Sequence, residues 1–440
     1  MYLAKTWSTG ITMSHLNVQL LLTGDELMTG DILDTNSMAV ADALMPLGLV
    51  LSRKVVVGDA LPQLVSEIES ITKQADVLIV NGGLGPTIDD LTAEALAAVI
   101  GQPIQEHPQA MAELQAWCER RNYPLNGPNK KQAMLPRGVE IVSNQTGSAP
   151  GFKVSHNDCI IVCTPGVPSE LAVMLESGIA PLLTELLSTL FGESYTQIKK
   201  FQVFGVGESP VQRILAENYP QWPDDIELGF RAAFPMLEVK LTAHSKNGIK
   251  LLPEWQSKVE DQLAGHIVAQ GNVSLPEALV TLLSDQKKTL ALAESCTGGL
   301  IASKLTSVAG SSQVFDAGIV SYSNEIKHKV LGVSQATLAE HGAVSEHVVL
   351  EMAEGVLALS QSDYAIAVSG VAGPGGGTPD KPVGTCWVAW GKKGALKTKC
   401  LFFPAERELF QQYIATAALD LIRRDLLSID AEPLYFSRSK

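Results

Sequence analysis

The chain has 440 residues, too long for one ordinary domain, so two or three domains are expected. Hydrophobic residues make up 46% and charged residues 18% of the sequence, a balance typical of globular proteins with sizeable cores. The formal net charge of −14 argues against a broad nucleic-acid-binding surface, because phosphate binding needs clustered lysine and arginine. A small anionic substrate is still compatible with this charge, since a few backbone amides and one or two cations can hold it.

Membrane insertion and secretion are not predicted. No stretch approaches about 18 consecutive apolar residues, and the first dozen residues lack the apolar core and cleavage site of a secretory signal. The six cysteines are scattered without a CxxC pair, which favours reduced thiols and argues against a zinc site. We therefore expect a cytoplasmic protein without a membrane partner.

The first segment, up to about Ile179, alternates apolar strands with amphipathic helices. The expected strands and helices, in chain order, are 18–24, 35–49, 53–59, 61–74 and 75–83, of which the second and fourth are helical. Thr35 or Asn36 is the candidate N-cap of the first helix. This rhythm predicts parallel strands with helices on both faces, and ligands of such sheets bind beyond the carboxyl ends of the strands.

The fold class predicted for the whole chain is α/β, in three parts. A first α/β domain is expected at residues 14–179, a small α+β module at 180–275, and a second α/β domain at 276–432. The middle module is interpreted as a spacer or docking domain, since its strand-like segments lack the alternating rhythm of the flanking parts.

In the third domain, the sequence AESCTGG places Ser295 after a short apolar strand and before a helical pattern. A serine on such a turn is exposed, and the helix behind it stabilises nearby negative charge. The alternative reading is an N-cap serine in a tight turn. Tyr322 and Lys327 follow a later strand, and a partly desolvated lysine or a Tyr–Lys pair can accept the serine proton. Both residues are also compatible with a solvated loop.

A glycine-rich loop follows the buried strand that begins near Tyr364, in the sequence SGVAGPGGG. Consecutive backbone amides in such a loop suit phosphate or carboxylate binding, although a flexible surface loop has the same composition. His328 and His341 are further candidate bases, and each is also compatible with an ordinary surface histidine.

These three motifs, in this order and spacing, resemble the CinA C-terminal domain family, the nicotinamide-mononucleotide deamidases. The resemblance implies that Ser295 attacks the carboxamide carbon and that Lys327 with Tyr322 relays the proton, without a cofactor. It implies substrate and oxyanion contacts from two loops, at Thr297, Gly298, Gly299, Ser369, Gly370, Gly373, Gly375 and Gly376. The family's Gly-Asp-Arg triplet is Ala405-Glu406-Arg407 here, which leaves Arg407 for a phosphate or structural role. A further arginine of the family is replaced around Gln411.

In the first domain, NGGLGPTIDD follows the third strand. Gly82, Gly83 and Gly85 permit a tight loop that surrounds an anion, and Asp89 and Asp90 open the next helix. Adjacent carboxylates beside such a loop suit a divalent metal, although acidic residues at a helix start are often only caps. Further polar residues are expected at the same sheet edge, namely Asp25, Glu26, Asp34, Asn36, Lys131 and Gln132.

These segments resemble the molybdopterin-binding-like domain at the head of CinA proteins. The resemblance implies metal-dependent hydrolysis of ADP-ribose to AMP and ribose 5-phosphate, or binding of a pterin. It implies metal ligands at Asp89, Asp90 and Glu26, and substrate contacts at Gly82, Gly83, Gly85, Thr87 and Lys131.

The sequence thus predicts a bifunctional hydrolase that recycles pyridine nucleotides. The alternative is a regulatory binding protein associated with competence or DNA damage. The expected partners are small nucleotides and a second copy in a homodimer, with no nucleic acid and no membrane.

Overall fold

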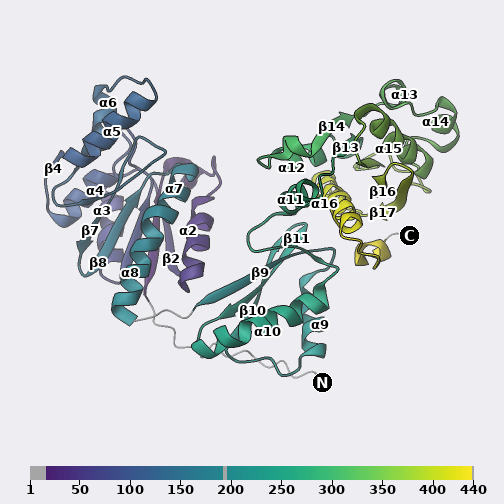
Figure 1. The fold of residues 1–440 in the computed structure, drawn as a ribbon. Helices are drawn as coiled ribbons and strands as arrows, with labels where there is room; N and C mark the ends of the chain where they lie inside the picture. Colours follow the sequence, from purple (N-terminus) through teal and green to yellow (C-terminus); the bar gives the residue numbers. More distant parts are fainter. Residues whose placement is uncertain (1–15, 192–195, 439–440) are drawn as a thin grey trace. The chain divides into compact units, whose positions relative to one another are not determined.

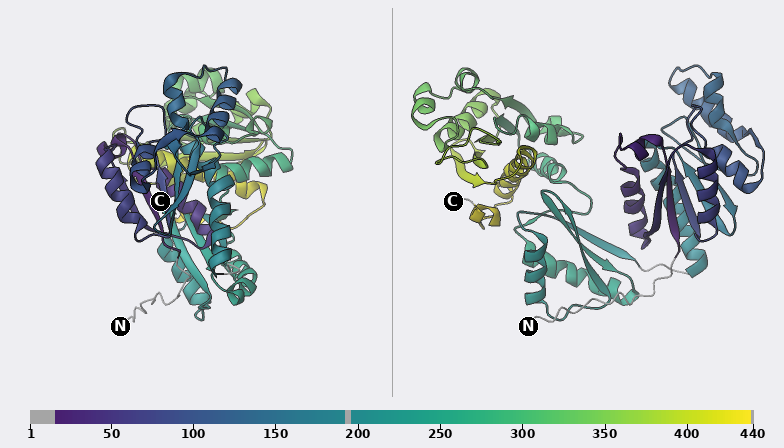
Figure 2. Two further views of the ribbon diagram at one scale, coloured as in Figure 1. Left: turned by 90° about the vertical axis from the view of Figure 1, so that its left-hand side faces the viewer. Right: turned by 180° about the vertical axis from the view of Figure 1, so that it is seen from behind.

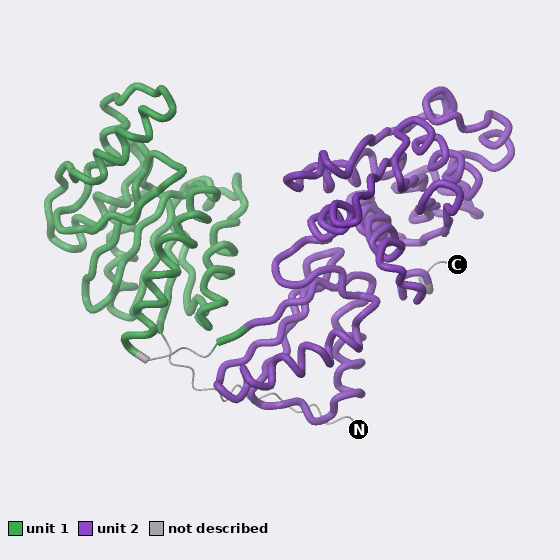
Figure 3. Tube along the Cα trace, viewed as in Figure 1, with its two compact units in different colours: residues 1–197 green, residues 198–440 purple. Residues whose placement is uncertain are grey.

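The computed structural model describes residues 16–191 and 196–438, so residues 14 and 15 at the start of the predicted first domain lie outside the described residues. The chain forms two compact units, residues 1–197 and 198–440 (Figure 3). The boundary expected between residues 179 and 180 falls inside a helical stretch of the first unit, and the boundary expected after residue 275 falls inside the second. The mixed α/β class predicted from the sequence is confirmed.

A six-stranded sheet in the order β2-β1-β3-β8-β7-β6 forms the centre of the first unit (Figure 1). Its strands are β1 (Val18–Thr23), β2 (Leu51–Val57), β3 (Val77–Asn81), β6 (Glu140–Val142), β7 (Gly151–His156) and β8 (Cys159–Thr164). The first four strands of that order are parallel, and β7 and β6 run antiparallel at one side. A separate pair joins β4 (Ile104–Glu106) to β5 (Met134–Pro136). The predicted parallel core is therefore confirmed.

Helices cover both faces of this sheet, as the view from behind shows (Figure 2). In β1, Leu20 and Leu22 contribute to the core beneath one helical layer and Leu21 to the core beneath the other, as alternation along a strand requires. The helices are α1 (Asp25–Thr29), α2 (Asn36–Leu44), α3 (Leu61–Thr72), α4 (Thr92–Ile100), α5 (Pro108–Arg120), α6 (Gly127–Lys130), α7 (Pro168–Met174) and α8 (Ala180–Phe191).

Thr35 occupies the predicted N-cap position of α2, but the capping hydrogen bond comes from another residue. The Thr35 side chain makes no capping hydrogen bond to α2, and the Asn36 amide points to Asn81 instead. The cap is Asp34, whose Oδ1 accepts from the Ser37 amide at 2.9 Å. Asp34, one position before Thr35, can cap the helix because its carboxylate reaches an unpaired N–H group at the helix start.

The helical stretch Pro168–Leu190 is long and apolar enough, by length and composition, to cross a membrane, which the count of consecutive apolar residues did not predict. Its buried leucines and isoleucine recur every four residues, at Leu171, Leu175, Ile179, Leu183 and Leu187. All five pack into one core with strands of the sheet. This packing is that of the core helix of an α/β domain.

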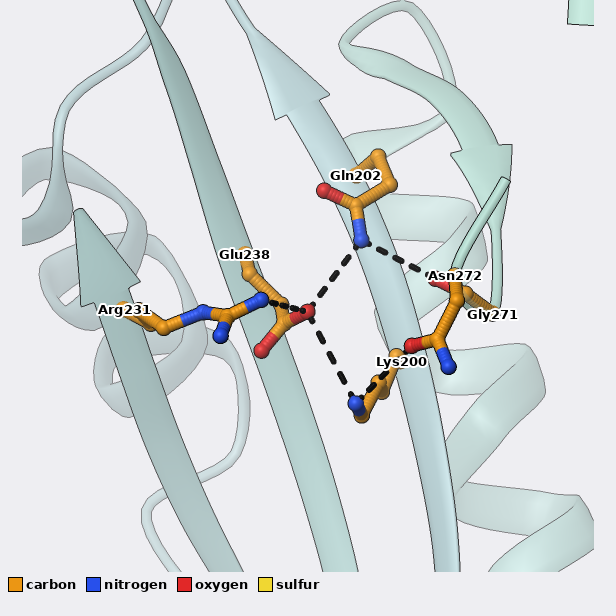
Figure 4. Close-up of polar contacts among 6 residues, drawn as sticks. All are labelled: Lys200, Gln202, Arg231, Glu238, Gly271 and Asn272. Carbon is orange, nitrogen blue, oxygen red and sulfur yellow. Dashed lines mark hydrogen bonds and ion pairs between the residues drawn. The ribbon is translucent and has the colours of Figure 1, made fainter. Parts of the chain in front are cut away.

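The second unit begins with a module of four strands in the order β10-β11-β9-β12. Its elements are β9 (Gln197–Phe204), α9 (Glu208–Asn218), β10 (Ile226–Ala233), β11 (Met236–Ala243), α10 (Lys246–Leu263) and β12 (Ile267–Gln270). Glu238 on β11 is 1% exposed, and its Oε2 accepts from Gln202 and from Arg231, each at 3.2 Å (Figure 4). The Lys200 Nζ lies 4.0 Å from the same oxygen. A buried carboxylate thus links three strands of this module.

A five-stranded sheet in the order β14-β13-β15-β16-β17 completes the second unit. Its strands are β13 (Leu290–Glu294), β14 (Phe315–Val320), β15 (Tyr364–Gly370), β16 (Thr385–Lys392) and β17 (Ala395–Phe402). Strands β14, β13 and β15 are parallel, and β16 and β17 continue the sheet antiparallel. The helices are α11 (Leu275–Asp285), α12 (Leu300–Thr306), α13 (Asn324–Leu331), α14 (Gln335–His341), α15 (Glu346–Ser360) and α16 (Arg407–Leu426).

The two modules of the second unit share a core. Phe204 at the end of β9 is 1% exposed and packs against Tyr413 of α16 and Tyr435 near the C-terminus, with ring centroids 5.5 and 5.1 Å apart. Val268 of β12 belongs to the same cluster of buried residues. The middle module therefore contributes apolar surface to the core beneath α16.

Candidate active site

The candidate site in the second unit forms where three parallel strands end. Glu294 of β13 pairs with Val320 of β14 on one side and Val368 of β15 on the other. The residue that follows each of these is a serine, and the Ser295 amide donates to the Val368 carbonyl at 3.1 Å. The carboxyl ends of adjacent parallel strands are the usual location of ligand sites in such sheets.

Ser295 and Lys327 are in hydrogen-bond contact. Lys327 lies in the first turns of α13, is 1% exposed, and places its Nζ 3.0 Å from the Ser295 Oγ. The same Nζ lies 2.7 Å from the Ser321 carbonyl oxygen and 3.5 Å from that of Tyr322. Burial lowers the pKa of Lys327, since the charged form loses its hydration. The electrostatic interaction with Cys296 opposes this shift but is the smaller of the two causes.

These contacts suit a neutral amine. An uncharged lysine has two N–H donors and one lone pair, and its neighbours are two carbonyl oxygens and a hydroxyl group. Donation to the carbonyls of Ser321 and Tyr322 leaves the lone pair for the Ser295 hydroxyl proton. The arrangement can therefore activate Ser295 as a nucleophile.

Glu294 holds the turn that carries Ser295, a role the sequence reasoning missed. Its carboxylate is 1% exposed and accepts from the Thr297 hydroxyl at 2.6 Å and from the amides of Gly299, Ile301 and Ala302 at 3.1, 3.1 and 2.8 Å. A buried carboxylate is thereby balanced by the first amides of α12. The available signal was an acidic residue directly before the serine and three positions before a threonine.

The predicted oxyanion donors need a correction. The Gly298 amide donates to the Ser295 carbonyl at 3.1 Å, and the Gly299 amide donates to Glu294, so neither points to a substrate. Both glycines instead provide left-handed backbone, with φ of 65° and 99°. For the amides of Cys296 and Thr297 no acceptor is found within residues 16–191 and 196–438. These two N–H groups are the better candidates for binding an oxyanion.

Tyr322 does not face Lys327 with its hydroxyl group. The Tyr322 side chain is 61% exposed, and its oxygen accepts from the Arg407 Nη2 at 2.7 Å. The Arg407 Nη1 donates to the Gly373 carbonyl at 3.0 Å. The proton relay predicted through the Tyr322 hydroxyl is therefore absent from this arrangement, and Arg407 links the Tyr322 loop to the glycine loop.

The glycine loop lies beyond β15. Ser369 is 1% exposed, and its hydroxyl donates to the Ala343 carbonyl at 2.7 Å, which fixes the strand end. Gly370 pairs with Cys386 across the sheet. Gly373 and Gly376 have positive φ of 77° and 85°, and a Cβ on Gly375 would meet no atom within 4 Å. The loop thus has the backbone freedom and open space expected of a ligand-binding segment.

A pocket of about 360 Å³ adjoins the turn on the side of α16. It is lined by Thr297, Gly298, Gly299, Leu300, Ser303, Glu408, Gln411 and Gln412. Ser295 and Lys327 are not among its lining residues, so the pocket neighbours the catalytic pair and does not enclose it. Gln411, at the position where the family has an arginine, donates its Nε2 to the Cys296 carbonyl at 2.8 Å.

In the first unit, the glycine loop after β3 that was predicted to bind an anion is held together by hydrogen bonds within the protein. The Asp90 Oδ2 accepts from the amide and hydroxyl of Thr87 at 2.8 and 2.5 Å. The Lys131 Nζ donates to the carbonyls of Thr87 and Asp90, each at 2.6 Å, and lies 3.6 Å from Glu94. A Cβ on Gly85 would lie 2.5 Å from the Asp90 carboxylate, so any other residue here would have to displace that side chain from Thr87.

The predicted metal ligands do not form a metal site. No group of three or more His, Cys, Asp or Glu side chains that could hold a metal ion occurs in residues 16–191 and 196–438. Asp90 is engaged with Thr87, Asp89 is exposed, and Glu26 lies against Gly24. The donor set expected from Asp89, Asp90 and Glu26 therefore does not fit a divalent cation.

Two groups of hydrogen-bonded amide side chains, one around Asn36 and one at Gln132, lie in the first unit. The Asn36 Nδ2 donates to the Asn81 Oδ1 at 2.8 Å and to the Gly166 carbonyl at 2.7 Å. The Gln132 Nε2 donates to the Ser148 hydroxyl at 3.1 Å. The Oδ1 of Asn36 and the Oε1 of Gln132 are buried without a partner in the described residues. Unpaired buried acceptors are costly, which makes both atoms candidates for ligand contacts.

This chain is similar over nearly its full length to proteins of one family. A CinA-like protein of Colwellia psychrerythraea is 50% identical over 97% of this chain and 98% of its own length. The chain belongs to the CinA-like protein family. A CinA-like protein of Shewanella piezotolerans is 40% identical over 94% of this chain and 96% of its own. Residues 272–426 match the CinA C-terminal domain, and residues 19–185 match the family described as "Probable molybdopterin binding domain".

Solved structures are also similar to one part of this CinA-like chain. The competence/damage inducible protein CihA from Agrobacterium tumefaciens is 39% identical, over 34% of this chain and 91% of its own, with a TM-score of 0.33. The two family matches and the full-length relatives confirm the family predicted from the sequence motifs, with a molybdopterin-binding-like domain and a CinA C-terminal domain.

Proposed function

We propose that the CinA domain of this chain deamidates nicotinamide mononucleotide to nicotinate mononucleotide and ammonia. The observation that carries the proposal is the 3.0 Å contact between the Lys327 Nζ and the Ser295 Oγ, at a lysine whose pKa burial lowers. A serine with a neutral lysine as its base is suited to acyl transfer. The identity of the substrate comes from the family resemblance.

In the proposed reaction the Ser295 Oγ attacks the carboxamide carbon while its proton passes to the Lys327 Nζ. The tetrahedral oxyanion is bound by the amides of Cys296 and Thr297, each of which contributes about 3 kcal/mol of stabilisation if well aligned. Protonated Lys327 returns the proton to the departing nitrogen, which leaves as ammonia. Water, deprotonated by Lys327, then cleaves the acyl-enzyme and releases the carboxylate product. Arg407 and the glycine loop position the nucleotide, and no cofactor is involved.

Ammonia release from nicotinamide mononucleotide, followed for the native chain and Ser295→Ala, tests this proposal. The variant should lose turnover by roughly six orders of magnitude, the scale seen when a catalytic serine is removed. Ser307→Ala is the matched control, because Ser307 is exposed just past the end of α12 and its hydroxyl donates to the Lys304 carbonyl. Full activity in Ser295→Ala would move the nucleophile elsewhere, and inactivity of the native chain would favour a regulatory binding protein.

For the molybdopterin-binding-like domain we propose nucleotide pyrophosphate binding at Asn36 and Gln132, with ADP-ribose as the substrate. Two buried acceptor oxygens without partners support a ligand rich in hydroxyl groups. Cleavage to AMP and ribose 5-phosphate is part of this proposal, and no step is assigned to a metal, because the carboxylates in the described part of the chain do not assemble a metal site. Calorimetric titration with ADP-ribose and with a pterin, comparing native protein with Asn36→Ala, separates the two ligands. Binding of the pterin alone would overturn the ADP-ribose assignment.

Both activities are expected in the cytoplasm, in a homodimer without nucleic-acid or membrane partners. Light scattering at micromolar concentration tests the dimer, and a monomer mass would reject it.

A further inference from the structure

Two buried thiols lie directly behind the candidate nucleophile. The Cys296 Sγ is 3.7 Å from the Cys386 Sγ, and the two residues are 4% and 0% exposed. Cys296 is the residue that follows Ser295, whereas Cys386 belongs to β16, which starts at Thr385. Residues from two distant parts of the chain thus bring two oxidisable groups together beneath one catalytic turn.

We propose that Cys296 and Cys386 form a reversible intramolecular disulfide that switches off the Ser295 site. The inference rests on the deamidase function proposed above only for its effect on activity. The bond itself is a covalent modification that can be detected whether or not the chain has that activity.

The chemistry requires a peroxide as the oxidant. The Cys296 thiol reduces hydrogen peroxide, becoming a sulfenic acid with release of one water. The Cys386 thiol then attacks that sulfur, and a second water leaves as the disulfide forms. Two thiols and one peroxide thus give one disulfide and two waters. A thiol reductant returns both residues to their starting state.

The order of the two steps follows from the surroundings. Cys296 is the more exposed thiol and interacts electrostatically with the Lys327 amine, so it lies on the side of the catalytic pair. Cys386 is enclosed, and burial raises its pKa well above the ordinary range. Cys386 is therefore unsuited to meet the oxidant first, and its 3.7 Å separation from Cys296 is what allows it to resolve the sulfenic acid.

We expect closure of the bond to shift the catalytic turn. A disulfide has an S–S distance of about 2.05 Å, so the two sulfurs must approach by roughly 1.6 Å from their 3.7 Å separation. Cys386 pairs with Gly370 on one side and Leu401 on the other, which holds it within the sheet. Cys296 lies on a turn, so we expect the approach to shift this turn and the adjacent Ser295 with it. A misplacement near 1 Å costs about a hundred-fold in rate.

The experiment treats the full chain with hydrogen peroxide, blocks the remaining thiols and digests it for mass spectrometry. We expect a Cys296–Cys386 crosslinked peptide and a loss of about a hundred-fold in ammonia release. Dithiothreitol should restore both the free thiols and the activity. Cys386→Val should keep basal activity and resist reversible inactivation, while Cys400→Val, from the adjacent strand β17, should behave like the native chain.

Absence of the crosslink, or reversible inactivation of Cys386→Val at the native rate, would overturn the proposal. The crosslink should also form in Ser295→Ala, which has no nucleophile. A chain that forms the crosslink but never releases ammonia would therefore reject the deamidase function and keep the disulfide.

Discussion

The Lys327 Nζ lies 3.0 Å from the Ser295 Oγ, although the two residues are 32 positions apart in the chain. Parallel pairing of β13 with β14 brings the two strand ends together, and α13 then returns Lys327 to the serine. The contact joins a nucleophile to a buried base without an intervening carboxylate or histidine.

Replacing Lys327 by methionine should separate catalysis from stability. Lys327→Met keeps the length of the side chain and removes the base, so kcat should fall about 100- to 10,000-fold. The free energy of unfolding should change by less than about 2 kcal/mol, because removal of the desolvated amine offsets the hydrogen bonds lost by the Ser321 and Tyr322 carbonyls. Steady-state kinetics and a thermal melt test this. A parallel loss of activity and melting temperature would indicate a purely structural lysine.

The rate should depend on pH through the same amine. Because burial lowers the pKa of Lys327, the base is neutral at a pH where an exposed lysine is still charged. Activity should rise with pH through that lowered pKa and then level off. Between the lowered pKa and the ordinary value of about 10.4 the unfolded chain binds more protons, so stability should also rise with pH in that window. A kcat/KM profile that is flat up to pH 10 would contradict the assignment.

Glu294→Gln should damage the catalytic turn. The Glu294 carboxylate accepts hydrogen bonds from one hydroxyl and three backbone amides through its two oxygens. A glutamine has only one acceptor oxygen, and its NH₂ group would face donors that it cannot pair with. We expect the free energy of unfolding to fall by about 2 kcal/mol and kcat to fall more than KM changes. Glu354→Gln, on the exposed face of α15, is the control. Unchanged kcat in Glu294→Gln would show that the turn keeps its shape without this carboxylate.

Arg407 should act on substrate affinity through two loops. Arg407→Lys cannot hold both Tyr322 and Gly373 as the guanidinium does, so KM for the nucleotide should rise with a smaller change in kcat. Tyr322→Phe removes only one of the two contacts. A double-mutant cycle in KM checks whether the effects are coupled, and strict additivity would mean that the Arg407–Tyr322 contact has no role in binding.

Glu238 in the middle module should be a determinant of stability. Glu238→Ala leaves Lys200, with its side chain 11% exposed, beside an empty space, and breaking a buried charge pair costs about 3–5 kcal/mol. Because Arg231 is partly exposed, the lower end of that range is expected. Urea unfolding followed by the fluorescence of Trp222 and Trp255, which pack in this module, measures the effect. Glu227→Ala, at a 65% exposed side chain, should cost less than about 1 kcal/mol.

The sequence predicted the parallel strands, because apolar runs mark buried strands. It also predicted the pairing of Ser295 with Lys327, because both residues follow strands that end at the same edge of the sheet. It did not predict where the Gly299 amide or the Tyr322 hydroxyl would point. These directions depend on Glu294 and Arg407, whose partners are set by the packing of α12 and α16. The metal site failed for a related reason, since adjacency of Asp89 and Asp90 in the chain does not make their carboxylates converge.

The ring of Phe204 has a further consequence for dissecting this chain. It is covered by Tyr413 and Tyr435, so cutting the chain before residue 276 would leave two aromatic rings facing water. A CinA domain excised in that way would expose an apolar aromatic patch that is buried in the intact protein. Poor solubility or self-association of such a fragment would result from the excision. Fragments intended for crystallisation or kinetics are better started at residue 198, where the second compact unit begins.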